Sequence, residues 1–513
     1  MSEKTVLHLY LNITGYMERS RSKCAEYQFK YMRYINKTAF INYLSCPTLG
    51  WMTRRNMLPK LTGPSNELLR FEGRNVRSIS WQLFSNAVDA RKLETGDAVL
   101  YTKELILDPG VKTIYGASFV AGGYLAKAGI LQKLDDNSWH LFEVKSGRKY
   151  KAKYARDMSF NTMVLAKSGL VVSKTTILCL SNDYRLGMNI SQLFKGLDCT
   201  EKVEPKVQEF LILSDEVLEN IESENMPEPY LKKNCKNCPV FDGCMSKDVK
   251  NHIFDLPRLS VLAIEELITA GVDTIDKIPA DFELTQMQQI VKNCVLINTN
   301  YVSENLKAEL GNIKQPFYYL DFESMITIVP LYRDIAPHTQ FLTQFSIDKT
   351  DDTGNILDHY EYIADQTRDC RREIAEKLIK YLGEEGSVVT YANFERTAIS
   401  NLAGFFPDLC EKLNKIAGRI VDLELIVKKN YYDINFRGRS SIKKILQVLV
   451  PEMNYADLKI GDGGDAAASF AFMAMGLYDD KKIEETKKNL LKYCARDTLA
   501  MVKIHQFLKS VVS

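Results

Sequence analysis

The sequence predicts two α/β domains joined by an all-helical segment, and three patterns along the chain support this fold class. Between residues 35 and 250, helical patterns alternate with short apolar runs that are typical of strands. Residues 251–312 show only helical spacing of apolar side chains. From residue 313 onward, a strand and a hairpin precede alternating helices and strands. We therefore expect domains at 35–250 and 313–513, a connector at 251–312 and an N-terminal extension at 1–34.

Length, charge and cysteine usage narrow the class of protein. A chain of 513 residues is long enough for about two to four domains with proper cores. Its net charge is only +2, so that any surface for nucleic acid must be local. Eleven cysteines, an odd number without an export signal, favour a reducing cytoplasm over a disulfide framework. No apolar run approaches the roughly 18–20 residues of a membrane span, so we expect a cytoplasmic protein without a membrane partner.

Strands and helices are predicted along the first domain and the connector. Apolar and β-branched runs predict strands at residues 112–115, 139–145 and 175–180. In the connector, apolar residues at helical spacing run from Val261, and Gly271 follows them as a left-handed C-cap. A helix, a Gly-Val turn and a second helix resemble a helix-hairpin-helix that grips a nucleic-acid backbone. A plain helical linker is the alternative.

The C-terminal domain begins with a pair of carboxylates on a predicted strand. Asp321 and Glu323 directly follow the apolar run at residues 317–320. Residues i and i+2 of a strand point to the same face, so that both carboxylates project together while Phe322 points into the core. Neighbouring carboxylates repel each other unless a cation lies between them. Paired divalent metals use such ligands to activate water in phosphodiester cleavage.

Further acidic candidates lie downstream of this pair. Tyr493 and Asp497 are spaced i and i+4 on the closing helix predicted at residues 489–508 and share one of its faces. Asp497 can complete a metal site while Tyr493 positions the attacking water. Glu395 follows the predicted strand at residues 387–391, and Asp422 is the alternative fourth ligand.

The order of these elements resembles the tyrosine variant of the DnaQ-like (DEDD) exonucleases, which have a ribonuclease H-like fold. That family carries Asp-x-Glu, then an Asn…Phe-Asp element, then Tyr-x-x-x-Asp. This sequence departs from the pattern at one position, where Glu395 replaces aspartate. The resemblance implies 3′→5′ hydrolysis of nucleic acid with two Mg²⁺ or Mn²⁺ ions held by Asp321, Glu323, Glu395 and Asp497.

Four cysteines form a second group of candidate ligands. Cys235, Cys238 and Cys244 lie close together, and Cys46 lies far upstream. One distant cysteine followed by a trio resembles the iron–sulfur RecB-like nucleases, including the CRISPR-associated exonucleases and AddB. The resemblance implies a [4Fe–4S] cluster that staples the ends of the domain. A Zn²⁺ site on the same thiolates, or a thiol cluster without metal, are the alternatives.

Between those cysteines lies an incomplete nuclease motif. Glu143 and Lys145 at the end of a predicted strand resemble the Glu-x-Lys of the PD-(D/E)XK nucleases, with the glutamate as metal ligand and the lysine stabilising charge. The motif also needs an aspartate on the preceding strand, where this chain has Gly129. Asn161 stands where such nucleases usually carry glutamine. We therefore expect impaired catalysis in this domain, through natural degeneration or an introduced substitution.

The complete pattern resembles a bacterial family of uncharacterised function that joins a RecB-like domain to a DnaQ-like domain. The resemblance rests on residues 318–324, 391–395, 440–446 and 491–502 and extends from about residue 35 to the end. It implies a 3′→5′ exonuclease on single-stranded nucleic acid, DNA favoured over RNA, within a repair or defence complex. The N-terminal domain would guide the strand, helped by a run of lysines and tyrosines at residues 145–154, unless that run is simply a solvated loop. A non-catalytic nucleic-acid-binding scaffold and a structured-RNA processor are the rival interpretations.

Overall fold

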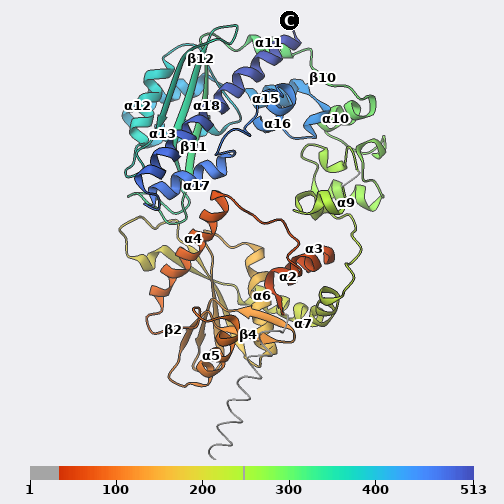
Figure 1. The fold of residues 1–513 in the computed structure, drawn as a ribbon, viewed down its shortest axis with the longest axis vertical. Coiled ribbons are helices and arrows are strands. Elements are labelled where there is room, and N and C mark those ends of the chain that lie inside the picture. Colours follow the sequence, from red (N-terminus) through yellow and green to blue (C-terminus); the bar gives the residue numbers. More distant parts are fainter. Residues whose placement is uncertain (1–33, 247–248) are drawn as a thin grey trace, which may run out of the picture. The chain divides into compact units, whose positions relative to one another are not determined.

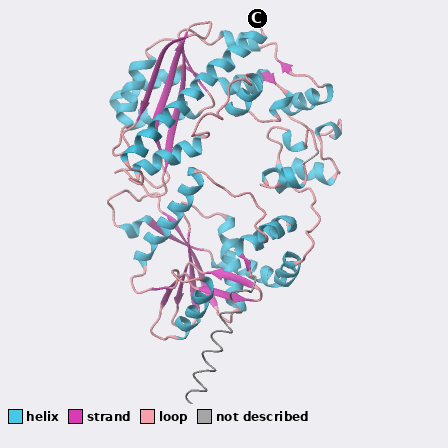
Figure 2. Cartoon of the chain, viewed as in Figure 1, coloured by secondary structure: helices cyan, strands magenta, loops and turns pink. Residues whose placement is uncertain are grey.

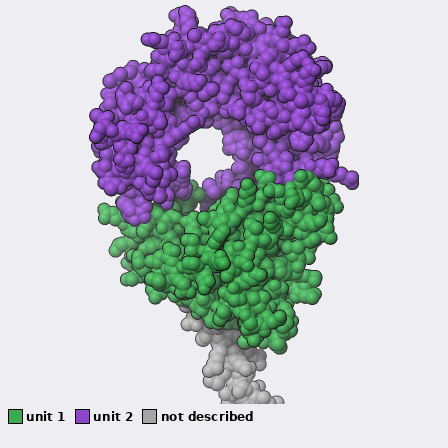
Figure 3. All heavy atoms as spheres, turned by 180° about the vertical axis from the view of Figure 1, so that it is seen from behind, with its two compact units in different colours: residues 1–59, 73–229 green, residues 60–72, 230–513 purple. Residues whose placement is uncertain are grey.

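The computed structural model describes residues 34–246 and 249–513. The predicted extension at residues 1–34 lies outside the described residues, apart from Tyr34. The chain forms two compact units, coloured separately in Figure 3: unit 1 contains residues 1–59 and 73–229, and unit 2 contains residues 60–72 and 230–513. Both units mix helices with sheets (Figure 2), so that the predicted α/β class is confirmed.

Unit 1 is built on a six-stranded mixed sheet and a smaller three-stranded sheet (Figure 1). The large sheet has the order β2-β3-β6-β7-β8-β9, and the small one has the order β1-β5-β4. The strands are β1 (Ile35–Asn36), β2 (Val88–Asp89), β3 (Thr113–Tyr115), β4 (Ser118–Ala121), β5 (Tyr124–Lys127), β6 (Ile130–Lys133), β7 (Trp139–Val144), β8 (Val172–Leu180) and β9 (Phe194–Asp198). The three strands predicted for this region are confirmed as β3, β7 and β8.

The helices of unit 1 cover these sheets and supply its core. They are α2 (Lys37–Ser45), α3 (Pro47–Arg54), α5 (Thr95–Leu107), α6 (Ala152–Lys167) and α7 (Thr200–Glu222). Helix α6 is buried along most of its length, and Phe160 from it packs at 5.2 Å between ring centroids against Phe40 of α2. Phe40 also contacts Phe210 of α7. Because α6 lies this deep beside the sheet, its polar residues can reach the end of β7.

Unit 2 is built on a five-stranded sheet with the order β13-β12-β11-β14-β15. Its strands are β11 (Phe317–Ile326), β12 (Gln340–Thr350), β13 (Ile356–Ile363), β14 (Ser387–Thr390) and β15 (Ile420–Asp422). Strand β12 is antiparallel to both β11 and β13, whereas β14 is parallel to both β11 and β15. The predicted strand at residue 317 is therefore the central strand of a mixed sheet.

Helices lie on both faces of this sheet (Figure 1). The helices of unit 2 after the connector are α12 (Arg371–Leu382), α13 (Phe394–Phe405), α14 (Cys410–Gly418), α15 (Leu423–Asn430), α16 (Ile442–Leu449), α17 (Gly463–Ala474) and α18 (Asp480–Val511). Helices α12, α13 and α14 share a core with the even-numbered residues of β11, such as Leu320 and Phe322. Helix α18 packs across β11 and β12, and its residue Met501 shares a core with Phe317 and Tyr319. Even-numbered residues of β11 thus face one core, and odd-numbered residues face the other.

The connector belongs to unit 2 and contains more than helices. Its helices and strand are α9 (Val261–Thr269), α10 (Gln286–Ile297), β10 (Tyr301–Val302) and α11 (Leu306–Gly311); α8 (Phe241–Cys244) precedes it, and β10 pairs with β16 (Tyr431–Tyr432). The prediction of an all-helical segment is therefore wrong at β10, where two residues complete a tertiary strand pair. Gly271 has φ +73° after α9, and the N–H groups of Gly271 and Val272 close a Schellman motif on Ile268 and Leu267. The predicted glycine C-cap is confirmed.

A short segment from the first half of the chain packs within unit 2. Residues 60–72 include the first turns of α4 (Pro64–Ser80), whose remaining residues belong to unit 1. The backbone N–H of Ser65 donates to Asp465 of α17 at 3.0 Å. Glu72 accepts a hydrogen bond from the N–H of Ile328 at 2.6 Å, and burial raises the pKa of Glu72 to about 7.

None of the described helices combines the length and apolar character needed to cross a bilayer.

Candidate metal centre

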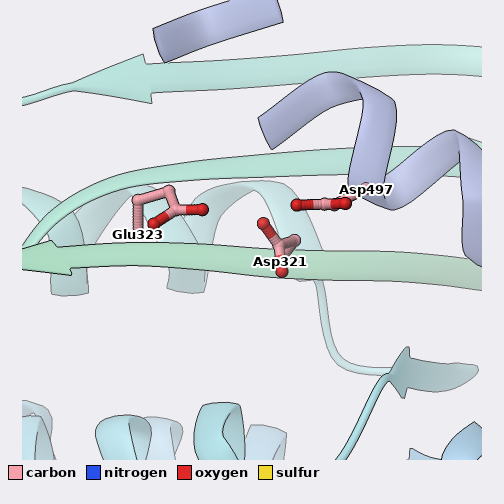
Figure 4. A group of neighbouring side chains, drawn as sticks. All are labelled: Asp321, Glu323 and Asp497. Atoms are coloured by element: carbon pink, nitrogen blue, oxygen red, sulfur yellow. The ribbon is translucent and has the colours of Figure 1, made fainter. Parts of the chain in front are cut away.

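The odd-numbered residues of β11 face α18, and two of them are the predicted carboxylates. Phe317 and Tyr319 lie in the core on the α18 side, so that Asp321 and Glu323 continue the same face by the two-residue period of a strand. Phe322 points to the opposite core and is 4% exposed. Figure 4 shows Asp321 and Glu323 projecting from the strand toward α18. The structure confirms the prediction that these two carboxylates lie on the same face of the strand.

Helix α18 adds Asp497 to this pair. Asp497 is 6% exposed, and its carboxylate extends toward Asp321 (Figure 4). Asp321, Glu323 and Asp497 each offer one oxygen, and these three oxygens all lie within 4.8 Å of one another. Oxygen-only ligands at this spacing suit hard divalent cations such as Mg²⁺ and Mn²⁺. The chain therefore brings together, from residues 176 positions apart in sequence, a set of ligands that fits a divalent ion.

Glu395 lies beside this group in the first turn of α13. It is 3% exposed, and its Oε2 has no hydrogen-bond partner among the described residues. Burial raises the pKa of Glu395 to about 8; the N–H groups of Glu395 and Phe322 oppose this shift, while Asp422 and Asp497 add to it. A buried carboxylate oxygen without a partner is costly unless it is protonated or bound to a cation. Glu395 therefore has the surroundings expected of a fourth ligand.

Asp422, the alternative fourth ligand, is used to hold the backbone. It is the N-cap of α15, where its Oδ1 accepts the N–H of Leu425 at 3.1 Å. The same oxygen accepts the N–H of Ala392 at 3.1 Å, and Ala392 has a left-handed φ of +78°. Both bonds are those of a structural cap, which stabilises the turn leading into α13. The geometry therefore favours Glu395 over Asp422 as a fourth metal ligand.

The carboxylates of this site hold their protons strongly when no cation is present. Burial and the neighbouring charges of Asp497 and Glu323 raise the pKa of Asp321 well above its ordinary value. Burial and Asp497 raise the pKa of Glu323 to about 8, and burial also raises the pKa of Asp497. Like charges in a desolvated site favour protonation unless a metal neutralises them. The raised pKa values of these carboxylates are thus those expected of a cation-binding site.

Three further side chains border the carboxylates. Tyr493 donates a hydrogen bond to Asp497, in agreement with the shared helix face predicted for this pair. Tyr455 also donates to Asp497, and Cys494 donates to Asp321 at 3.2 Å between sulfur and oxygen. Nothing in the sequence pattern singled out Tyr455, since it lies in the loop between α16 and α17. Cys494 is fully buried and adjoins the site.

Metal binding should make the stability of the protein less sensitive to pH. Because the pKa values of Glu323 and Glu395 are raised to about 8, the metal-free folded state binds more protons than the unfolded chain between about pH 4.5 and 8. Its unfolding free energy should therefore fall as pH rises through this window. Mn²⁺ at about 100 times its Kd should restore about 2.7 kcal/mol. We expect thermal unfolding to show a larger Mn²⁺-induced rise in Tm at pH 8 than at pH 6; an equal rise at both would contradict this.

The residues of the predicted nuclease motif in unit 1 lie together, but lysine side chains surround its glutamate. Glu143, on β7, accepts a hydrogen bond from Asn161 of α6 at 2.5 Å. Lys37 and Lys145 each lie 3.9 Å from one of its oxygens, and Lys145 pairs with Asp157 at 2.7 Å. Burial lowers the pKa of Lys145, but Glu143 and Asp157 outweigh this and raise it overall. The lysines therefore supply the positive charge that a metal would otherwise provide.

Gly129 occupies the place of the absent carboxylate. It directly precedes β6, and a Cβ built on it would lie 3.8 Å from Oε2 of Glu143. A side chain at position 129 would thus point at Glu143, as the expected aspartate of the motif should. The same Cβ would lie 3.0 Å from the carbonyl oxygen of Phe142, so that this backbone must shift slightly to admit a side chain. Among the described residues, Glu143 belongs to no group of three or more metal-ligating side chains.

The four predicted cysteine ligands are divided between the units. Cys46 caps α3 in unit 1, whereas Cys235, Cys238 and Cys244 belong to unit 2. Sulfur ligands of one zinc ion lie about 3.8 Å apart. Within the described part of the chain, the trio in unit 2 forms no group with sulfur atoms within 4.8 Å. A [4Fe–4S] cluster, whose thiolates lie farther apart, stays a prediction for these four residues.

Comparison with known proteins finds one family match over part of unit 2 and relatives that match longer stretches of the chain. Residues 318–441, which include Asp321, Glu323 and Glu395, match a family described as "Domain of unknown function (DUF2779)". An uncharacterised protein of Ureaplasma parvum serovar 3 is 22% identical over 364 residues, 65% of this chain and 52% of that protein. An uncharacterised protein of Mycoplasma pneumoniae is 24% identical over 231 residues, 41% of this chain and 35% of that protein. The chain spans about a third to a half of the length of these relatives.

Proposed function

We propose that the protein is a metal-dependent 3′→5′ exonuclease that degrades single-stranded nucleic acid at the carboxylate site of unit 2. The observation that carries this proposal is the group of Asp321, Glu323 and Asp497, with oxygens within 4.8 Å of one another. Glu395 supports it as a buried carboxylate with an unpartnered oxygen. A surface ion pair does not account for buried carboxylates that gather without an ion-paired cation in the described part of the chain.

Each side chain of the site has a role in this proposal. Bound Mg²⁺ or Mn²⁺ would activate the attacking water and stabilise the leaving oxygen. Asp321, Glu323, Glu395 and Asp497 would hold the ions. Tyr493, which hydrogen-bonds Asp497, would orient the attacking water. Tyr493 is only 3% exposed, so that its ring is held beside the carboxylates of the site.

The finer fold assignments belong to the same proposal. We assign unit 2 to the ribonuclease H-like fold, supported by its mixed sheet with the carboxylates on the central strand β11. We assign most of unit 1 to the RecB-like fold, supported by Glu143 at the end of β7 and by Asn161 on the helix that follows. With Gly129 in place of an acid, unit 1 would bind and guide the strand rather than cut it. A [4Fe–4S] cluster, a cytoplasmic location and a role in repair or defence complete the proposal.

A direct assay of the wild-type protein tests this function. A 5′-labelled single-stranded DNA and an RNA of the same sequence are incubated with Mn²⁺, and the products are separated on a sequencing gel. We expect a ladder that shortens from the 3′ end, suppression by EDTA, and protection of a DNA that ends in a 3′-phosphorothioate linkage. An intact substrate in every condition would overturn the proposal and leave a non-catalytic scaffold.

The degenerate site of unit 1 should not contribute to this activity. Glu143→Ala removes the acidic member of the Glu-x-Lys motif, but Gly129 already leaves it without a second carboxylate. We expect the degradation rate to change by less than about twofold, since one carboxylate among lysines cannot hold the catalytic ions. The rate should be measured on the same DNA at saturating Mn²⁺. A loss of activity in Glu143→Ala, with Asp321→Ala still active, would move catalysis to unit 1.

A further inference from the structure

A short loop rich in arginine and lysine leads to the metal centre of unit 2. The segment 437–444, here called the basic loop, contains four cations among eight residues and ends in the first turn of α16. Its cations are Arg437, Arg439, Lys443 and Lys444. The net charge of the whole chain is only +2, so that four cations in one loop are a local concentration of charge. Such a concentration is typical of polyanion binding.

The basic loop is held rigidly by the rest of unit 2. Tyr391, just after β14, donates its hydroxyl hydrogen bond to the carbonyl of Ser440 at 2.7 Å. The hydroxyl of Ser440 donates to Glu424 at 2.8 Å. Gly438 has φ +66°, and a Cβ there would lie 1.9 Å from the carbonyl oxygen of Asp255. The backbone is thus fixed before any ligand arrives, which reduces the entropic cost of binding.

One end of the basic loop touches the metal centre. The Nζ of Lys443 lies 4.8 Å from the ring centroid of Tyr493 and 5.0 Å from that of Tyr455. It also donates to the carbonyl of Gly461. Tyr455 in turn donates a hydrogen bond to Asp497 of the site. Lys443 therefore lies close enough to the site for its ammonium group to contact a phosphate bound beside the metal ligands.

The other cations of the loop carry charge that the protein does not balance locally. Arg437 and Arg439 are exposed, and within the described residues neither forms a side-chain ion pair, unlike Arg372 and Arg496 of the same unit. Burial and the repulsion of Arg437 and Arg439 lower the pKa of Lys444. The acidic groups that face this cluster are Asp255 and Asp433, and burial raises the pKa of Asp255. Arg437, Arg439 and Lys444 thus face two carboxyl groups, while Lys443 borders the metal centre.

We propose that the basic loop binds the phosphate backbone of the substrate strand, with Lys443 beside the phosphate at the metal centre and the arginines on phosphates farther along. This inference rests on the proposed function and names the surface by which the same site holds a single strand. Arginine suits the role because its planar guanidinium binds phosphate through two donors and stays charged. Contacts to phosphate carry no base preference, so that the loop should hold DNA and RNA of any sequence.

The test is the double substitution Arg437→Ala/Arg439→Ala in the full chain. Binding of fluorescent dT20 and rU20 is measured by anisotropy with Ca²⁺ in place of Mn²⁺, at several salt concentrations, and degradation is measured separately with Mn²⁺. We expect Kd and KM to rise roughly tenfold with kcat nearly unchanged. The slope of log Kd against log salt should fall by about 1.4, because each single-strand phosphate contact contributes about 0.7.

Two further variants keep the outcome interpretable. Lys481→Ala/Lys488→Ala removes the same charge from exposed residues of α18 and should leave binding and the salt slope as in the wild type. Arg437→Lys/Arg439→Lys keeps the charge and should recover most of the affinity. Unchanged Kd and salt slope in Arg437→Ala/Arg439→Ala, while the wild type degrades DNA, would overturn the basic loop alone. A wild type that binds through these arginines but degrades neither polymer would overturn the proposed exonuclease and retain the surface.

Discussion

Asp321→Ala should reduce exonuclease activity by at least about 10³-fold, because it removes one of the carboxylates that would hold the ions and leaves too few ligands to hold them. Asp321 lies at the centre of the site, where burial, Asp497 and Glu323 all raise its pKa. The rate constant for loss of the first 3′ nucleotide should be measured at saturating Mn²⁺. A rate within about tenfold of the wild type would show that the carboxylates of unit 2 are not the catalytic site.

Two comparisons separate catalysis from folding in this experiment. Asp281→Ala is a matched control, since Asp281 is an exposed aspartate of the same unit outside the site, and it should retain full activity. Asp321→Asn removes a buried charge that other carboxylates repel. In metal-free buffer at pH 8 it should therefore unfold at a higher temperature than the wild type, while being inactive. A lower Tm for Asp321→Asn would mean that Asp321 stabilises the fold in some other way.

Glu395→Ala should lower activity by about 10²-fold or more, whereas Asp422→Ala should act mainly on stability. Glu395 is a buried carboxylate with an unpartnered oxygen beside Phe322. Asp422 caps α15 and accepts the N–H of Ala392, so that its loss should cost about 1 kcal/mol of unfolding free energy. Activity per folded molecule and chemical unfolding should be measured on both variants.

Conservative substitutions make the distinction between these two residues sharper. Asp422→Asn keeps an oxygen acceptor at the N-cap and should recover the stability lost in Asp422→Ala. Glu395→Gln keeps the shape of the side chain but not its charge, and it should stay inactive with an undiminished Tm. The opposite pattern, with Asp422→Asn inactive and Glu395→Gln active, would make Asp422 the fourth ligand. Glu395→Asp should be measured beside Glu395→Gln, because aspartate is the residue that the exonuclease pattern has at this position.

Local periodicity explains why much of the metal centre could be predicted. On β11 the two-residue period alone places Asp321 and Glu323 on one face. On α18 the i, i+4 spacing alone places Tyr493 beside Asp497. The glycine cap of α9 is equally local, since Gly271 needs a positive φ that other residues rarely adopt. Each of these features depends on the backbone within a few residues.

Packing between distant segments explains why other features could not be predicted. The strand β10 exists only because β16, some 130 residues later, pairs with it. Residues 60–72 contact Asp465 and Ile328 in unit 2, although their neighbours in sequence belong to unit 1. No local pattern marks a two-residue strand or a displaced segment, because their stability comes from partners far along the chain.

The sequence by itself determined the α/β class, the central strand with its carboxylate pair, and the companion pair on the last helix. Only the tertiary structure decided that Glu395 keeps one oxygen without a partner among the described residues while Asp422 is a helix cap, and that Lys443 and Tyr455 border the site. It also decided that Lys37 and Lys145 surround Glu143 where Gly129 leaves no second acid. The physical reason is that side-chain direction follows local periodicity, whereas burial, charge balance and hydrogen-bond partners depend on what the rest of the chain places nearby.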